Sequence, residues 1–186
     1  AIEYELSTSN RNFVDYLNFS MNNQKDIPKF AEIINTYEPK NVVINGKNRD
    51  ILEKLNKNIK TIINRTQSCT TIFGNTKIKT ITKNSYMYIE INIDNASFLV
   101  VPDGGNADDI PEKWLEPDYL ICNGLPQNYK KINFKNIIIS ETKKASEIYL
   151  SKLSGDYKNV FSLYHQGNIY IHVNSYNKNS QIRRIM

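Results

Sequence analysis

The apolar residues between positions 14 and 63 alternate between the spacing of strands and the spacing of helices. Phe30, Ile33, Ile34 and Tyr37 recur every three or four residues and therefore fall on one face of a helix. We expect strands at 14–19, 41–44 and 60–63, and helices at 27–37 and 49–55. This order of strand, helix, strand, helix and strand is typical of layered α/β proteins.

Beyond residue 70 the pattern changes to short runs separated by turn residues. Gly74-Asn75 and Asp94-Asn95 predict hairpin turns between strands at 70–73, 77–82, 86–93 and 97–101. The elements predicted after them are a short helix at 109–114, strands at 119–122 and 136–140, a helix at 143–153, and a terminal hairpin of 160–164 and 168–173. In the helix at 143–153 we expect Ile148, Leu150 and Leu153 to face inward.

The composition is that of a globular domain. With 186 residues, of which 40% are hydrophobic, the chain can bury a core. We expect a lead-in at 1–12, one α/β domain at 13–175, and a basic, frayed tail at 176–186. Cys69 and Cys122 have no metal-ligand spacing and are predicted to be two buried free thiols. No apolar run approaches the ~20 residues of a membrane span, and no signal peptide is visible.

The segment 14–27 resembles the strand, ligand-bearing turn and helix start of metallo-β-lactamase folds. In that family the turn reads Thr-His-x-His-x-Asp-His and holds two metals. Here Ser20 takes the Thr position, Met21 and Asn23 take the first two His positions, and Lys25 and Asp26 take the Asp and the last His positions. A thioether, an amide and an ammonium group cannot hold catalytic zinc. The segment therefore keeps the frame of the motif and lacks its ligands.

The rest of the chain resembles the C-terminal metallo-β-lactamase-like domain of ComEC-type competence proteins, which are membrane channels for single-stranded DNA. The segment 95–103 is similar to the family strand Phe-Leu-Leu-Thr-Gly-Asp, whose Asp bridges two metals. The segments 117–122, 136–140 and 164–171 are similar to the later strands and the terminal hairpin. The first strands of the family are missing. The resemblance implies an α/β fold of metallo-β-lactamase-like αββα layers that is partial, with those strands absent or shed.

Asp26 and Asp103 are the weak candidates for metal ligands. Two carboxylates could hold Mg²⁺ or Mn²⁺ weakly, but Asp26 also suits a helix cap and Asp103 a turn cap. Lys25 would repel a divalent ion beside Asp26, which favours the caps. His165 and His172 have no partner at ligand spacing. We therefore expect no metal site, no cofactor and no enzyme activity, with residual metal-dependent hydrolysis left open.

The resemblance implies a catalytically inactive domain that binds or guides single-stranded DNA, or acts as a scaffold, in a DNA-uptake membrane protein. In the resembled fold Lys130, Lys131, Lys143 and Lys144 fall in loops on the rim that once held the metals, where cations can contact phosphates. The net charge of +5 permits such a partner, although lysine-rich surfaces also serve solubility.

The other expected partner is the membrane-channel portion of the same or another protein. This portion would tether the domain to the bacterial membrane through segments outside this chain. Two alternatives stay open: a fragment of a metal-dependent hydrolase or nuclease, and an interaction module without a nucleic-acid role.

Overall fold

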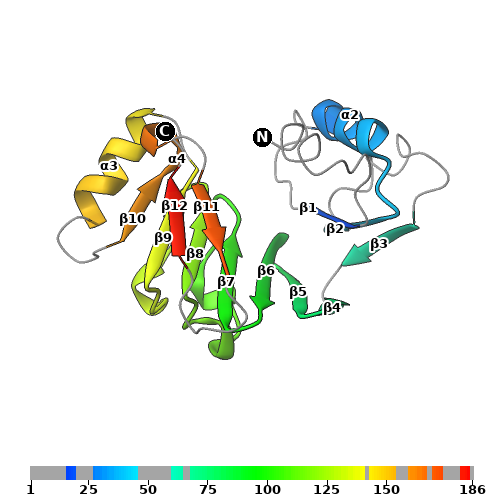
Figure 1. Ribbon diagram of the computed structural model, residues 1–186, viewed down its shortest axis with the longest axis horizontal. Helices are drawn as coiled ribbons and strands as arrows, with labels where there is room; N and C mark the ends of the chain where they lie inside the picture. Colours follow the sequence, from blue (N-terminus) through cyan, green and yellow to red (C-terminus); the bar gives the residue numbers. More distant parts are fainter. Residues whose placement is uncertain are drawn as a thin grey trace. The chain divides into compact units, whose positions relative to one another are not determined.

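The computed structural model describes residues 16–19, 27–45, 60–64, 68–140, 143–153, 159–166, 169–173 and 181–184. The chain divides into two compact units, one of residues 1–67 and 82–87 and the other of residues 68–81 and 88–186, a division that the sequence did not indicate. The predicted boundaries at residues 12 and 175 lie outside the described residues. Figure 1 shows the elements of both units.

The first unit contains a parallel sheet of three strands. The strands β1 (Tyr16–Phe19), β2 (Asn41–Asn45) and β3 (Lys60–Asn64) lie in the order β1-β2-β3. In the central strand, Val42, Val43 and Ile44 are at most 1% exposed. A continuous apolar run of this kind is what a parallel strand buried on both faces requires. The three predicted strands are confirmed.

One described helix, α2 (Ile27–Tyr37), belongs to this unit. It buries Ile34 completely, while Glu32 and Asn35 are exposed, so its amphipathic pattern is the one predicted. The helix predicted at 49–55 lies outside the described residues.

Glu38 ends helix α2 in a conformation that favours glycine. Its φ is 40°, and its N–H donates to the carbonyl of Ile34 at 2.9 Å. Glu38→Gly should therefore raise the free energy of unfolding by about 0.5–1 kcal/mol in urea titrations followed by circular dichroism. Glu32→Gly, the same change inside the helix, should instead lower it by about 1 kcal/mol. Equal losses for both variants would contradict the left-handed conformation of Glu38.

A seven-stranded sheet forms the body of the second unit, except that residues 82–87, at the end of β5 and the start of β6, are grouped with the first unit. Its strands are β4 (Cys69–Phe73), β5 (Thr76–Lys83), β6 (Tyr86–Ile93), β7 (Ala96–Val101), β8 (Tyr119–Cys122), β9 (Asn136–Ile139) and β10 (Val160–Ser162). They lie in the order β10-β9-β8-β7-β6-β5-β4. β4 with β5 and β6 with β7 are antiparallel pairs, whereas β7 to β10 run parallel. The hairpins and core strands predicted from residue 70 to residue 140 are thus confirmed.

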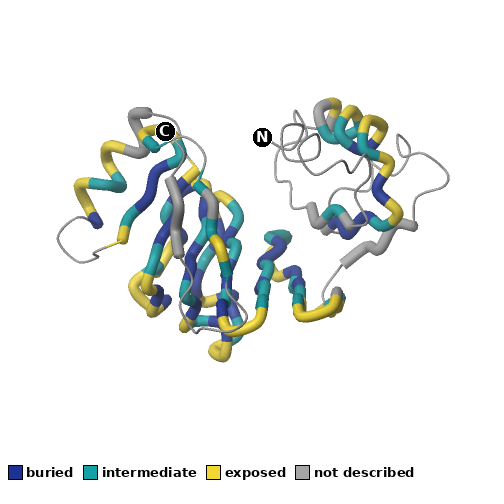
Figure 2. The backbone as a smooth tube through the Cα atoms, in the orientation of Figure 1, coloured by how far each residue is buried: buried dark blue, intermediate teal, exposed yellow. Residues whose placement is uncertain are grey.

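Both faces of the parallel strands are buried. On one face, Phe98 of β7 stacks on Tyr119 of β8 with ring centroids 4.8 Å apart. On the alternate positions, Leu99 and Leu120 are paired in register and fully buried. Figure 2 shows buried residues along β8, β9 and β10. Of the two free cysteines, Cys122 is buried as predicted, but Cys69 on the edge strand β4 is only half-buried.

The predicted terminal hairpin is wrong. Strand β10 instead pairs parallel with β9 and is followed by a short helix, α4 (Leu163–Gln166). The next strand, β11 (Ile169–His172), pairs antiparallel with β12 (Gln181–Arg184), so this part of the predicted frayed tail is a strand. The physical reason is burial, because Phe161 of β10 and the apolar side chains of β11 pack against the same core cluster as Phe98.

The helices of this unit differ from prediction in detail. The helix α3 (Lys143–Leu153) buries Leu153 fully and Leu150 partly, but Ile148 is 45% exposed. Leu150 and Leu153 are three residues apart and share a face, whereas Ile148 is only two residues from Leu150 and points elsewhere. In place of the helix predicted at 109–114 there are two 3₁₀ turns, η3 (Ala107–Asp109) and η4 (Glu112–Trp114).

Candidate functional site

The candidate site lies at the carboxyl ends of the parallel strands, where β7 runs into a tight turn. Gly105 donates its N–H to the carbonyl of Pro102 at 3.0 Å, and Gly104 has a φ of 72°, which is typical of a type II turn. Asp103 occupies the first corner of this turn and is exposed. The structure therefore places Asp103 two residues after the end of β7, in the predicted turn.

A buried tyrosine fixes the segment that follows the turn. Tyr88 of β6 is fully buried; its hydroxyl donates to Asp109 Oδ2 at 3.2 Å and accepts the N–H of Asn106 at 3.0 Å. Asp109 is itself only 9% exposed. The carboxylate of Asp109, at the carboxyl ends of the parallel strands, is thus held by Tyr88 of strand β6.

A second carboxylate, that of Asp108, is held from the next crossover. It accepts hydrogen bonds from Asn128 Nδ2 at 2.6 Å and from the ammonium group of Lys131. The N–H of Asp108 in turn donates to Asn106 Oδ1 at 3.0 Å. Asn106 also forms a parallel bridge with Gln127, which joins the loops that follow β7 and β8. These side chains therefore cross-link two loops of the protein.

The zinc that the resemblance implies does not fit the described part of this edge. The turn after β8 reads Asn123, Gly124, Leu125 and Pro126, and it offers neither an imidazole nor a carboxylate. Within the described residues no three His, Cys, Asp or Glu side chains come together as metal ligands. Catalytic zinc takes three such ligands. Asp26 lies outside the described residues, and both His165 in α4 and His172 in β11 are exposed.

The four predicted DNA-binding lysines lie in the connections that follow β8 and β9, and the helix predicted at 143–153 is confirmed. Lys130 and Lys131 belong to the 3₁₀ turn η5 (Tyr129–Lys131), where both are exposed. Lys143 and Lys144 begin α3, four residues after β9, and their side chains lie outside what the structure describes. A backbone hydrogen bond from the Ile132 N–H to the carbonyl of Tyr129, at 2.9 Å, closes the turn η5.

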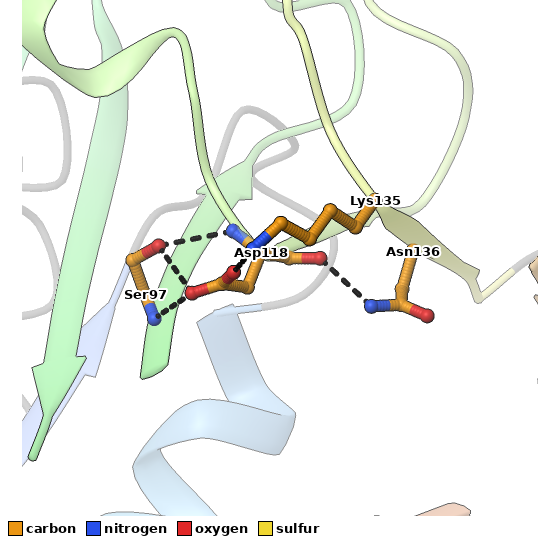
Figure 3. A network of polar contacts seen from close by, with 4 residues as sticks. All are labelled: Ser97, Asp118, Lys135 and Asn136. Carbon is orange, nitrogen blue, oxygen red and sulfur yellow. Dashed lines mark hydrogen bonds and ion pairs between the residues drawn. The ribbon is translucent and has the colours of Figure 1, made fainter. Parts of the chain in front are cut away.

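A different polar network, which the sequence did not predict, lies at the amino ends of the same strands (Figure 3). Asp118 accepts the N–H and the hydroxyl of Ser97, each at 2.9 Å, and the ammonium group of Lys135 at 2.5 Å. Asn136 Nδ2 donates to the carbonyl of Asp118 at 3.0 Å. Because Ser97, Asp118 and Asn136 start or precede β7, β8 and β9, the network joins three neighbouring strands.

The charge of Asp118 is stabilised within this network. Burial raises the pKa of the Asp118 carboxyl, but hydrogen bonds from Lys135 and Ser97 together lower it more, so the pKa lies below its ordinary value. The hydrogen bond to Asp118 raises the pKa of Lys135 in turn. The sequence signal was the placement of Ser, Asp and Lys-Asn at or directly before the starts of three strands, but it becomes visible only once those strands are known to be neighbours.

Comparison with known proteins identifies the fold. The chain is similar to the crystal structure of the metallo-β-lactamase fold protein YhfI from Bacillus subtilis, with a TM-score of 0.51 and 12% sequence identity over 79% of this chain and 73% of that chain. No family model and no curated protein matches the chain. The chain therefore has a mixed α/β, metallo-β-lactamase-like fold, as predicted, and at this identity the likeness concerns the fold alone. Among the described helices, none has the length and apolar character needed to cross a membrane.

Proposed function

We propose that this chain is a catalytically inactive metallo-β-lactamase-like domain that binds or guides single-stranded DNA in a ComEC-type DNA-uptake protein of the bacterial membrane. The observation that carries the proposal is the state of the carboxylates at the carboxyl edge. Asp108 and Asp109 are held by Lys131 and Tyr88, so they serve as internal hydrogen-bond acceptors. In this proposal, a domain whose carboxylates at the carboxyl ends of the strands are occupied in this way keeps the metallo-β-lactamase-like fold and has lost hydrolytic activity.

The DNA-binding part of the proposal rests on charge. Lys130 is exposed beside this edge, and Lys143 begins α3 four residues after β9. Cations need only reach phosphates to hold a single strand, and the net charge of +5 favours the approach of DNA. Lys131 contributes less because Asp108 already accepts its ammonium group.

The test is fluorescence anisotropy of a labelled single-stranded oligonucleotide across a salt series. Binding should weaken steeply with salt, and Lys130→Ala should reduce the slope of log K against log salt by about 0.7, the value for one phosphate contact on a single strand. Lys131→Ala should reduce it less. Lys77→Ala, which removes an exposed lysine of β5, is the matched control and should leave the slope unchanged.

Two other results would point to the alternative functions. If no oligonucleotide binds at low salt, the domain is an interaction module, and its partner is a protein such as the channel portion. If the chain cleaves DNA with added Zn²⁺ or Mn²⁺, and Asp103→Ala abolishes the cleavage, the chain is a metal-dependent hydrolase and the inactive assignment is wrong.

A further inference from the structure

The short helix α4 presents an aromatic ring to solvent. Among the residues whose side chains the structure describes, Tyr164 is the only Phe, Tyr or Trp that is exposed, at 51%. His165 beside it is exposed as well. The faces of nucleic-acid bases stack on exposed aromatic rings whatever the base, because every base has a π-face. The pair of Tyr164 and His165 is therefore a candidate surface for a base.

The residues on either side of this pair are anchored to the protein. Leu163 packs against the core cluster that contains Phe98 and Phe161. Gln166 Oε1 accepts the N–H of Ser162 at 3.0 Å, so its side chain fixes α4 to the end of β10. The backbone that carries the two rings is held at both ends, and the rings are directed away from the core.

The two rings also hold each other. Their centroids are 5.1 Å apart and their planes meet at 87°, which is the edge-to-face arrangement that aromatic pairs prefer. In this arrangement the edge of one ring meets a face of the other, so neither ring uses both of its faces. A base could stack on a remaining face at a low cost in side-chain entropy, because the ring is already positioned.

The register of the sheet places this pair at the same edge as the predicted DNA-binding lysines of α3. Val101, Cys122, Ile139 and Ser162 form one row of paired residues across the parallel strands β7, β8, β9 and β10. Tyr164 follows this row by two residues. Lys143 follows it by four residues, on the neighbouring strand, and α3 contacts α4 (Figure 1). A cationic residue and an aromatic pair thus follow adjacent strands.

We infer that Tyr164 and His165 stack on a base of a single DNA strand whose phosphates contact the lysines of this edge. The inference rests on the proposed DNA-binding function, and it adds the contact to the bases. Proteins that bind single strands without sequence preference combine cations for the backbone with aromatic rings for the bases. Stacking distinguishes a single strand from a duplex, in which the faces of the bases are already covered.

The experiment is a cycle of two proteins and two strands, followed by fluorescence anisotropy. Tyr164→Ala should weaken the binding of an oligothymidine by about 5- to 150-fold, the loss expected for one stacked base. It should leave the binding of an abasic oligonucleotide of equal length unchanged, because that strand has no base to stack. The slope of log K against log salt should also stay the same, since stacking releases no counterions.

Three further variants serve as controls. Tyr164→Phe keeps the ring and should bind the oligothymidine as the wild type does. Tyr164→Leu keeps the apolar bulk without the ring, so it should bind as weakly as Tyr164→Ala, and it replaces that variant if alanine prevents folding. Ile148→Ala, which shortens a 45% exposed apolar side chain of α3, should have no effect.

The outcomes separate this inference from the proposed function. If Tyr164→Ala and Tyr164→Leu bind the oligothymidine as the wild type does, the inference is overturned and DNA binding through lysines stands. Equal weakening of the oligothymidine and the abasic strand would also overturn it, because Tyr164 would then act on the strand without contacting a base. If the wild type binds no oligonucleotide at low salt, the proposed DNA function fails and the stacking site fails with it.

Discussion

Replacing Gly105 with alanine should lower the free energy of unfolding by about 3 kcal/mol, because there is no room for a side chain at this position. A Cβ atom on Gly105 would lie 2.7 Å from Val101 Cγ1, 2.9 Å from the carbonyl oxygen of Pro102, and 3.3 Å from Tyr88 Cε1. The carbonyl oxygen is backbone and accepts the N–H of Gly105 in the same turn, so it cannot move aside without opening the turn.

The matched control for this variant is Gly74→Ala in the β4–β5 turn. Gly74 has a φ of 51° and no atom within 4 Å of an added Cβ, so it tests backbone strain without a steric clash. We expect a loss of about 1 kcal/mol there. Urea titrations of both variants measure the difference. Equal losses would mean that the carboxyl-edge turn relaxes freely, and the packing of Gly105 on Tyr88 would then have no energetic weight.

Replacing Asp118 with alanine should lower the free energy of unfolding by about 2 kcal/mol at neutral pH. The change removes the acceptor of the Ser97 N–H, the Ser97 hydroxyl and the Lys135 ammonium group. Hydrogen bonds to charged groups contribute about 1.5–3 kcal/mol, and unpaired partly buried donors add a cost. Lys135→Ala is the comparison variant, and it should cost less than about 1 kcal/mol because the Lys135 side chain is 76% exposed.

The contribution of Asp118 should also depend on pH, with a defined sign. The pKa of Asp118 is lower in the folded chain than the value of about 3.9 of an unfolded Asp. The ionised carboxylate therefore stabilises the fold fully above that value, and this stabilisation is lost as the pH falls through the lower folded pKa. Urea titrations at several pH values should show the wild type and Asp118→Ala converging in stability below about pH 4. A constant difference across that range would contradict a charged hydrogen-bond network.

Most of the described fold could be predicted from the spacing of apolar residues. Helix α2 and the strands from β4 to β9 follow local periods and turn dipeptides, which are properties of neighbouring residues. The partners of β10 and β11 could not be predicted, because pairing across distant segments depends on which apolar faces must be covered. Ile148 shows the same limit, since its exposure depends on how α3 lies against the sheet.

Only those residues of the candidate site that lie close to the end of a strand could be predicted from the sequence. Asp103 could be placed because only Pro102 separates it from the apolar run of β7. Lys131 could not be paired with Asp108 from the sequence, since the two lie on different crossovers. A cavity of about 110 Å³ that is lined by Trp114, Glu90 and Leu99 was not predictable either. It depends on the η4 segment lying against side chains of β6 and β7, and nothing in the residues near Trp114 indicates which strands those are.

Strand β7 is the point where the sheet changes direction, since it is antiparallel to β6 and parallel to β8. A slip of one residue along this strand would exchange Phe98 and Leu99 between the two faces of the sheet. It would also move Ser97 away from Asp118. The two hydrogen bonds that Ser97 donates to Asp118, from its N–H and from its hydroxyl, can form in one register only. The polar network around Asp118 therefore favours one register of β7. It raises the free energy of folds with a shifted register, even if those folds bury nearly as much apolar surface.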